Sequence, residues 1–470
     1  MIATMTYTHQ LIVIGAGSGG LVAAEFAASL GANVAMIEKS SSLGGECLHA
    51  GCVPSKALIA EARRYAQTSK DQPVTLDYKK VHKHIKQAIS HIETTHDNDA
   101  YYQAKNIEVI HGEATFINKS EIKVGLKTYR AKKYIIATGS RPFVPSIPGL
   151  AGTPYLTNDS VFDLKALPKD LIVIGGGPIG CEIGQAMAML GANVTILHTS
   201  DRLLPRDEPE VSQTVMDSFK HMKITVRLSI EITSVEYVNG IYTVNFASGK
   251  KVTGSDILVA TGRQAVMPGG LDLAKVKTTD RGIVVNRQLR TNRRHILAVG
   301  DCNAGPQFTH AAADQAVIAV RNALFGLQGK TDPALLPWTT FTTPENAHFG
   351  PMKDTLKDTI QDGSSTVLRK SYDTIDKATA ESEPGVIEMI IDRKGKVIAA
   401  TVIGHNAGEI VAQIRFGGTI DGLASVIQAY PTYGIAVKEM ASQYKLAKFQ
   451  QSTIGKFFKK RFQANSLRKK

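Results

Sequence analysis

The sequence predicts an α/β fold with two Rossmann-like dinucleotide-binding domains. Residues 11–20 run from a short apolar strand into a glycine-rich turn and a helix, and residues 170–182 repeat the pattern. An apolar run followed by Gly-x-Gly-x-x-Gly is typical of a buried parallel strand and the first turn of the next helix. A pair of cysteines, Cys47 and Cys52, follows the first of these units directly. The fold and the chemistry are therefore predicted from adjacent segments.

The first glycine-rich turn predicts a nucleotide site. Its glycines permit a tight turn, a close approach of the backbone to a pyrophosphate, and close packing of the helix on the strand. The pyrophosphate would lie at the helix N-terminus, where free N–H groups favour an anion. The second strand ends in an acid, at the distance where a carboxylate accepts hydrogen bonds from a ribose. The residues expected to contact this nucleotide are Gly15, Gly17, Gly20, Glu38 and Lys39.

The second glycine-rich turn predicts that a second nucleotide binds. It contains Gly175, Gly177 and Gly180, and the strand that follows it ends before His198. The acid that would select an unphosphorylated ribose is therefore missing. Because Arg202 follows shortly after, a 2′-phosphate is acceptable here, and we favour NADPH weakly over NADH.

The cysteine pair predicts electron transfer. Four cysteines in 470 residues make a secreted disulfide framework improbable and favour a dedicated redox pair. Pro54 suits the first turn of a helix beginning at Cys52, and a helix N-terminus stabilises a thiolate. Cys181 and Cys302 are isolated and are interpreted as packing residues. A structural zinc site needs four ligands, and no second pair is near, so we assign no metal.

Two later segments fit a flavin. Residues 291–301 form a short strand ending in Asp301, whose carboxylate can accept hydrogen bonds from a ribityl chain. His310 and Ala311 begin a helix of small residues, and the N-terminus of this helix can stabilise negative charge on a reduced flavin ring. Thr138, Gly139 and Gly262 stand at strand ends where the chain is expected to pass between domains.

Together these motifs, with residues 343–350, resemble the pyridine nucleotide-disulfide oxidoreductases, which include dihydrolipoamide dehydrogenase, glutathione reductase and mercuric reductase. The resemblance runs from about Gln10 to Ala441. It implies an FAD-binding domain made from two segments, an inserted NAD(P)-binding domain, and a C-terminal α/β dimerisation domain that forms a homodimer. The expected segments are 1–150 and 276–337 for FAD, 151–275 for NAD(P), 338–445 for the dimerisation domain, and 446–470 for a basic amphipathic tail.

The expected reaction passes hydride from NADPH or NADH to FAD and then two electrons to a disulfide between Cys47 and Cys52. Cys52 is the candidate flavin-facing sulfur, and Cys47 would meet the substrate. The resemblance pairs Lys56, near the flavin N5, with Glu182 on the second fingerprint helix. Gly45, just before Cys47, is expected to contact the cofactor.

Two departures from the family bear on the substrate. Disulfide reductases carry His-Pro-Thr-x-x-Glu near the C-terminus, where this chain has Tyr430 and Ile435 in place of the acid-base pair. A phenol is a poor proton shuttle at neutral pH, so disulfide turnover is disfavoured. Mercuric reductase has a tyrosine there too, although this chain lacks that enzyme's C-terminal cysteine pair. Glu46 replaces the usual threonine; it either disfavours a thiolate on Cys47 or is a solvated turn residue.

These residues favour a mercuric-reductase-like enzyme that reduces a metal ion or a small electrophile such as a quinone, with Tyr430 as a catalytic candidate. One alternative is a low-molecular-weight disulfide reductase. The other is a peripheral membrane redox protein or sensor. No nucleic-acid module accompanies the basic residues.

The C-terminal tail concentrates the positive charge. Residues 445–470 hold nine Lys or Arg and no acid, and they supply most of the net charge of +13. Phenylalanines fall near one helical face, so the tail suits either an anionic membrane surface or packing on the dimerisation domain. Met1–His9 lacks the pattern of a signal peptide, so a cytoplasmic location is expected, with contact at a membrane surface as the open question.

Overall fold

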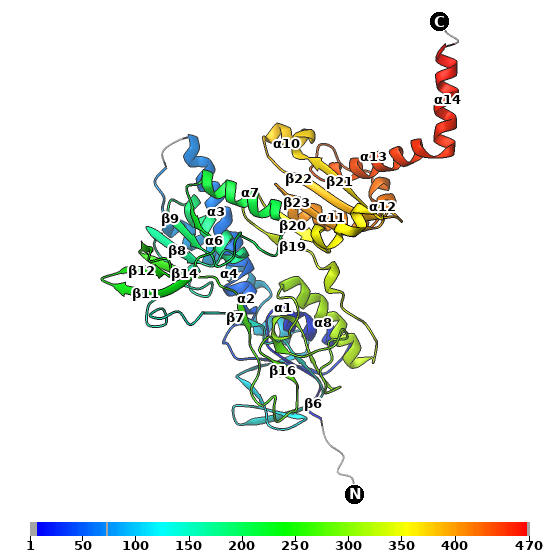
Figure 1. Ribbon diagram of the computed structural model, residues 1–470. Coiled ribbons are helices and arrows are strands. Elements are labelled where there is room, and N and C mark those ends of the chain that lie inside the picture. The colour runs from blue at the N-terminus through cyan, green and yellow to red at the C-terminus, as the bar shows by residue number, and fades with distance from the viewer. Residues whose placement is uncertain (1–6, 72–73, 468–470) are drawn as a thin grey trace. The chain divides into compact units, whose positions relative to one another are not determined.

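The computed structural model describes residues 7–71 and 74–467, and predictions for residues 1–6 and 468–470 lie outside them. The chain divides into two compact units (Figure 1). The first contains residues 1–203 and 219–333, and the second contains residues 204–218 and 334–470. The finer division of the first unit into FAD and NAD(P) domains stays a prediction.

The first unit is built on a sheet of seven strands whose centre is parallel. Side chains of the central strands are almost fully buried, as parallel strands covered on both faces require. Two helices, α1 (Ser18–Ser29) and α8 (Thr309–Leu324), pack against each other and share a core with the sheet. The strands are β1 (His9–Ile14), β2 (Val34–Glu38), β3 (Ile107–His111), β4 (Ala114–Phe116), β5 (Glu121–Val124), β6 (Lys127–Ile136) and β18 (Ile296–Ala298). A late segment of the chain thus completes a sheet that the first segment begins.

A second, four-stranded parallel sheet carries the second glycine-rich turn. Its strands are β8 (Asp170–Ile174), β9 (Asn193–Leu197), β10 (Thr225–Arg227) and β14 (Asp256–Val259), and helix α6 (Pro178–Met189) follows β8. An antiparallel meander, formed by β11 (Ile232–Val238), β12 (Ile241–Phe246) and β13 (Lys251–Gly254), shares its core. The segments expected to pass between domains form β7 (Ser140–Pro142) and β15 (Arg263–Ala265), which pair antiparallel.

The cysteine pair lies on two consecutive helices. Helix α2 (Gly45–His49) carries Cys47, and helix α3 (Cys52–Asp71) begins at Cys52, as expected. Helix α4 (Tyr78–Thr95) and the short α5 (Asp99–Gln103) follow, and α3 packs against both α4 and α6. Cys181 and Cys302 are fully buried in the core, as expected for packing residues.

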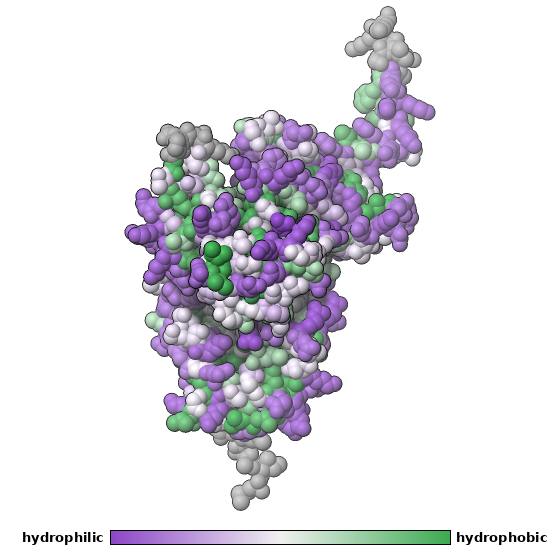
Figure 2. Space-filling model, turned by 60° about the vertical axis from the view of Figure 1, so that its left-hand side comes forward, coloured by the Kyte–Doolittle hydropathy of each residue, from purple (hydrophilic) through white to green (hydrophobic). Residues whose placement is uncertain are grey.

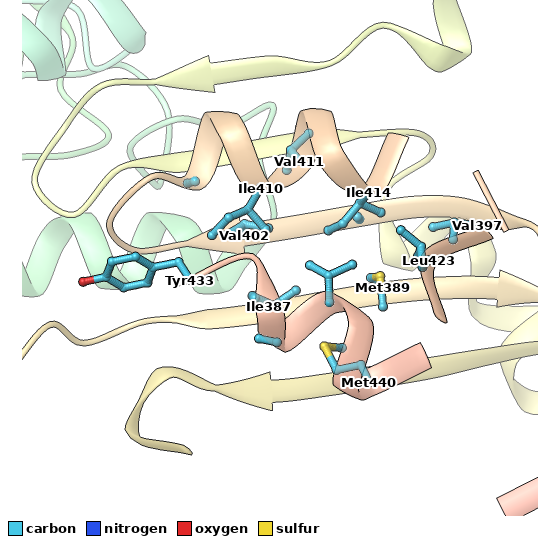
Figure 3. Close-up of a cluster of buried hydrophobic side chains, with 14 of the residues drawn as sticks. Ile387, Met389, Val397, Val402, Ile410, Val411, Ile414, Leu423, Tyr433 and Met440 are labelled. Carbon is cyan, nitrogen blue, oxygen red and sulfur yellow. The ribbon is translucent and has the colours of Figure 1, made fainter. Parts of the chain in front are cut away.

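The second unit is a five-stranded antiparallel sheet covered by helices. Figure 3 shows Ile410 and Ile414 of helix α11 meeting Met389 and Val402 of the sheet, with Met440 of α13 in the same buried cluster. The strands are β19 (Trp338–Thr340), β20 (Asn346–Phe349), β21 (Ser365–Ser371), β22 (Val386–Asp392) and β23 (Val397–Ile403). The later helices are α11 (Ala407–Gly417), α12 (Ile420–Ser425), α13 (Ile435–Gln451) and α14 (Thr453–Leu467). Across the described ranges, no helix combines the length and apolar content needed to cross a membrane.

Candidate active site

A backbone contact fixes helix α2 on the first glycine-rich turn. Gly45 has φ +58°, and a Cβ added to it would lie 2.7 Å from the Cα of Gly17. The N–H of Gly44 donates to the carbonyl of Ala16 at 3.0 Å. Because a side chain on Gly45 would meet backbone at this distance, the contact restricts that position to glycine, whereas a Cβ on Gly17 would make only an ordinary contact with the Cα of Gly45, at 3.9 Å. Cys47, two residues after Gly45, is thereby held beside the predicted pyrophosphate site.

The two sulfurs are free thiols that interact with each other. The hydrogen bond from Cys47 lowers the pKa of the Cys52 thiol to about 6, and contacts with Thr309 and Lys56 act in the same direction against partial burial. Thr309 Oγ1 lies 3.3 Å from the sulfur of Cys52. The same pairing and burial raise the pKa of Cys47. The reduced pair therefore holds its negative charge on Cys52 and its proton on Cys47.

The first glycine-rich turn fits the adenine-nucleotide half of FAD. Gly15 has φ +102°, and a Cβ on Gly20 would lie 1.8 Å from the carbonyl oxygen of Gly15, so both positions need glycine. Gly17 stands at the start of α1, and an added Cβ would meet only the Cα of Gly45, at 3.9 Å. The buried carboxylate of Glu38 accepts a hydrogen bond from the N–H of Ala16 at 2.7 Å. An anion can thus approach the helix N-terminus, with an acid beside it.

The second turn has the same geometry with a different polar group. A Cβ on Gly180 would lie 2.0 Å from the carbonyl oxygen of Gly175, whereas Gly177 has open space around it. His198 Nδ1 accepts a hydrogen bond from the N–H of Gly176 at 3.1 Å, which matches the bond from Ala16 to Glu38. Burial lowers the pKa of His198, so the imidazole is neutral and its proton is on Nε2. This Nε2 is buried and has no hydrogen-bond partner among the described residues.

Lys56 and Glu182 form the ion pair that the resemblance implied. Lys56 Nζ donates to Glu182 Oε2 at 2.8 Å, across the packed helices α3 and α6. The Glu182 side chain is only 9% exposed, so the charge of Lys56 offsets the free energy of burying the carboxylate. The pair joins the thiol-bearing helix to the helix that begins at the second nucleotide turn. The position of Lys56 beside the flavin ring stays a prediction.

Glu46 is neither an unpaired charge beside Cys47 nor a solvated turn residue, which were the two expectations for it. Its carboxylate forms an ion pair with Arg263 and accepts a hydrogen bond from Asn158 Nδ2 at 2.6 Å. Arg263 Nε also lies 3.7 Å from Asp301, and Ser140 Oγ donates to Asp301 at 2.6 Å. Because Arg263 neutralises Glu46, the carboxylate does not act as a free charge beside Cys47. In the sequence, Arg263 directly follows Gly262, and nothing in its spacing indicated this network.

The contact of Asp301 with a flavin ribityl chain stays a prediction. Burial raises the pKa of its carboxyl, while Ser140 and Arg263 favour the ionised form. Thr138 Oγ1 donates to the carbonyl of Val266 at 2.6 Å. Gly139 and Gly262 have positive φ and open space beside them, and His310 and Ala311 lie in the first turn of α8 after Thr309. Lys39 is exposed just after β2, and Arg202 is half-buried in the loop after β9; their contacts with nucleotides stay predictions.

Tyr430 belongs to the second unit and is 67% exposed. Its hydroxyl donates a hydrogen bond to Asp376, and that bond raises the pKa of the phenol above its usual value. Tyr433 is buried, and its hydroxyl donates to Glu381 at 2.6 Å. Tyr433 is therefore a packing residue of its own unit. The catalytic role of Tyr430 stays a prediction.

A cavity of about 410 Å³ opens beside Cys47 within the first unit. Its wall comes from α1, from the end of α4 and from α5, and from the start of α8. Aliphatic and aromatic side chains dominate the wall, and no Lys or Arg is among the described residues that line it. Its lining includes Leu21, Ile92, Tyr101 and Tyr102, together with the acids Glu25 and Asp97 and the imidazole of His96. Lys105 forms an ion pair with Glu25, so Asp97 is the lining carboxylate that no described Lys or Arg pairs with, and a small neutral or cationic molecule fits this largely apolar wall better than an anion.

Substituting Gly45 should loosen the cofactor. We expect Gly45→Ala to weaken FAD retention and to lower the melting temperature, because a methyl group there meets backbone, which cannot move aside. Gly31→Ala is the matched control: Gly31 has φ +81° but open space around it, so it has the backbone strain without the contact. Flavin content and thermal unfolding of both variants measure the difference. Equal effects of the two substitutions would contradict the argument.

The thiol of Cys52 should titrate at an unusually low pH. In the reduced protein, ultraviolet thiolate absorbance is expected to rise through a midpoint near pH 6, because a lowered pKa leaves the thiolate present above it and lost below it. Cys47→Ala removes the hydrogen-bond donor and should move the midpoint upward. Cys302→Ala is the control, since burial raises the pKa of Cys302 to about 11. A wild-type midpoint near the ordinary thiol value would refute the assignment.

Comparison with known proteins identifies the family. The description "Pyridine nucleotide-disulphide oxidoreductase" matches residues 9–316, and the dimerisation domain of the same family matches residues 336–441. A mercuric reductase from Streptomyces lividans is 34% identical over 460 residues, covering 93% of this chain and 96% of that protein. A dihydrolipoyl dehydrogenase from Geobacillus stearothermophilus is 32% identical over 456 residues, covering 92% and 95%.

Solved structures agree with this fold. LpdA from Mycobacterium tuberculosis has a TM-score of 0.85 at 25% identity and covers 93% of this chain and 99% of its own. The Cu(II) complex of RclA, an HOCl-induced flavoprotein disulfide reductase from Escherichia coli, has a TM-score of 0.83 at 24% identity, with 93% and 100% covered. Members of the family bind FAD and use NAD(P)H, and the dimerisation domain indicates a homodimer. The chain therefore belongs to the pyridine nucleotide-disulphide oxidoreductases and is an FAD-dependent enzyme.

Proposed function

We propose that the enzyme uses the dithiol of Cys47 and Cys52 to reduce a small, neutral or cationic two-electron acceptor, either a soft metal ion or a quinone. The observation that carries this proposal is the cavity beside Cys47, which is largely apolar and whose two lining carboxylates are Glu25, paired with Lys105, and Asp97, which no described Lys or Arg pairs with. The mercuric reductases among the relatives, at 33 and 34% identity, support a metal ion as one acceptor.

The residues of the chain divide the work. FAD, when bound, would accept a hydride from NAD(P)H and pass two electrons to the disulfide. Breaking the S–S bond with two electrons and one proton leaves a thiolate on Cys52 and a thiol on Cys47, in accord with their opposite pKa shifts. Lys56 and Thr309 stabilise the thiolate. The dithiol then passes both electrons to the acceptor, the S–S bond re-forms, and a quinone also takes up two protons.

Residues of the second unit also favour a metal ion over a disulfide as the acceptor. A disulfide substrate releases a thiolate that needs a proton, whereas a metal ion does not. Tyr430 is hydrogen-bonded to Asp376, and the raised pKa of its phenol makes it a weaker acid at neutral pH than a free tyrosine. Ile435 cannot orient it as a glutamate would orient a histidine. Positioned acid catalysis typically supplies about 10²- to 10⁴-fold in rate, and this chain lacks the residues that provide it elsewhere in the family.

Lipoamide, a cyclic disulfide, is the second candidate acceptor. The relatives named dihydrolipoyl dehydrogenase are 32 or 33% identical over nearly their whole length, and lipoamide is neutral, so the apolar cavity suits it. Glutathione disulfide is less suitable because its carboxylates would face a largely apolar wall and the carboxylate of Asp97.

An acceptor screen should separate these candidates. With saturating NADPH or NADH, we expect the holoenzyme to reduce mercuric ion or quinones faster than lipoamide and glutathione disulfide. Tyr430→His with Ile435→Glu should raise kcat/KM for disulfides by about 10- to 100-fold, because the pair restores a positioned acid. Tyr430→Phe is the control and should leave the disulfide rates unchanged. Rapid disulfide turnover by the wild type, without gain from the double variant, would reject the proposal.

The nicotinamide cofactor is proposed to be NADPH. His198 replaces the acid of the first site: it accepts the N–H of the turn as Glu38 does, but it presents a buried N–H donor where Glu38 presents an acceptor. A neutral imidazole does not repel a 2′-phosphate as a carboxylate would, and it offers no acceptor to the ribose hydroxyls.

Replacing His198 should change the preference of the enzyme between NADPH and NADH. We expect His198→Glu to lower kcat/KM for NADPH and raise it for NADH, with the ratio changing by at least about tenfold, because a carboxylate repels the 2′-phosphate and accepts from the ribose hydroxyls. His198→Gln, which keeps a donor without adding charge, should retain the wild-type preference. A wild type that already prefers NADH, with no change in His198→Glu, would contradict the assignment.

A further inference from the structure

The last helix of the chain has no part in the proposed reaction. Helix α14 begins at Thr453, after the match to the dimerisation domain ends at residue 441. A sharp corner separates it from α13: a Cβ on Gly455 would lie 2.0 Å from the carbonyl oxygen of Phe449, and Gly455 N–H donates to Ser452 Oγ at 3.1 Å. The corner gives α14 a direction of its own, so it is not a continuation of α13.

Large apolar side chains on α14 are exposed to solvent. Phe458 and Phe462 stack with ring centroids 6.3 Å apart, and Phe457 packs edge-on against Phe458 at 5.8 Å. The exposed fractions are 61% for Ile454, 59% for Phe457, 41% for Phe458 and 67% for Phe462. At 3.6 residues per turn, these four side chains fall within about 140° of the helix circumference. These side chains therefore do not pack on the sheet of their own unit. Packing on the dimerisation domain, one of the two expectations for the tail, is not what the structure shows.

The opposite side of α14 is basic. Lys456, Lys459 and Lys460 lie away from the apolar side chains by the same periodicity, and Arg461 lies within the apolar arc. In the described part of the chain, no carboxylate pairs with any of these four cations. Figure 2 shows hydrophobic and hydrophilic side chains side by side along this helix, at its upper right. Charge and apolar surface are therefore separated around one short helix.

We infer that α14 is a docking helix for the surface of an anionic lipid bilayer. The phenylalanines would enter the headgroup boundary, the lysines would meet lipid phosphates, and Arg461 would extend from the apolar side toward the headgroups. The helix has 15 residues, about 22 Å, which is shorter than the hydrocarbon thickness of about 30 Å. It therefore lies along the surface.

The combination of both faces favours lipid over nucleic acid. Phosphates of a nucleic acid would satisfy the lysines, but they leave the exposed phenylalanines in water. A bilayer provides an anionic plane and an apolar layer at the spacing that an amphipathic helix needs. The inference is independent of the electron acceptor, because α14 contributes no residue to the cavity beside Cys47.

Vesicle sedimentation of the holoenzyme tests the inference. The full chain should bind vesicles of equimolar phosphatidylcholine and phosphatidylglycerol, and bind phosphatidylcholine vesicles at least about tenfold more weakly. Phe458→Ser with Phe462→Ser should reduce binding to the anionic vesicles by at least about tenfold, and Lys456→Gln with Lys460→Gln should reduce it by a similar factor. NAD(P)H oxidation in solution should be unchanged in both variants, which separates this test from that of the proposed function.

Matched controls alter exposed residues elsewhere. Phe325→Ser removes an exposed phenylalanine of the first unit, and Lys250→Gln with Lys251→Gln removes two exposed lysines of the meander. These controls should bind vesicles as the wild type does. Equal binding by the wild type and a chain ending at Ser452 overturns the inference. Duplex DNA binding that is lost in the lysine variant and kept in the phenylalanine variant, without vesicle binding, overturns it in favour of nucleic acid.

A fluorescent reporter distinguishes docking from packing within the homodimer. The chain has one tryptophan, Trp338, so Phe462→Trp adds a second emitter, and Trp338→Phe in the same chain leaves it as the only one. Its emission should be that of an exposed indole in solution and should shift to the blue on adding the anionic vesicles. A blue-shifted emission before vesicles are added would show that the helix is buried in the dimer and would overturn the inference.

Discussion

The contact between Gly17 and Gly45 is the constraint on which the site depends. It brings the first glycine-rich turn and the segment that carries Cys47 together at a distance that no side chain on Gly45 allows. Helix α2 has five residues and would not hold a position by itself. The contact with Gly17 fixes the position of α2, and the hydrogen bond from the N–H of Gly44 to the carbonyl of Ala16 supports the same placement.

The asymmetry of the thiol pair follows from that placement. Cys52 starts a 20-residue helix and lies within reach of Thr309 and Lys56, so its environment favours a negative charge. Cys47 lies on the short helix beside the apolar cavity, where a charge is unfavourable. The fold thus separates the sulfur whose environment favours a thiolate from the sulfur that borders the cavity. Lys56 in turn is held by Glu182, so the helix that starts the second nucleotide site also supports the thiolate.

The sequence predicted the parts of this site that depend on local patterns. Glycine spacing identified both nucleotide turns, and Pro54 indicated the helix that begins at Cys52, because these are properties of a few consecutive residues. It did not find Thr309 or the interaction of Glu46 with Arg263, which join residues more than 200 positions apart. Such contacts come from how the sheets pack, and no periodicity in a single sequence records them. For the same reason the two interpretations of Glu46, a charge acting on Cys47 or a solvated turn residue, both missed its ion pair with Arg263.

For His198, the sequence predicted the position but not the contacts of the side chain. Its position at the end of a strand marked it as the counterpart of an acid, but only the structure shows that one ring nitrogen takes over the structural bond of that acid. The other nitrogen is left as a buried donor. The substitution therefore keeps the turn and changes what the turn offers to a ligand.

Helix α14 belongs to the unit that forms the homodimer, so every assembled enzyme carries it twice. A single short amphipathic helix binds a surface weakly and reversibly, but two helices on one dimer act together, since the second attaches at a high local concentration once the first has attached. Residence at a surface would then depend on the association of subunits as well as on lipid charge. A monomer and a dimer with the same sequence would partition differently between solution and surface.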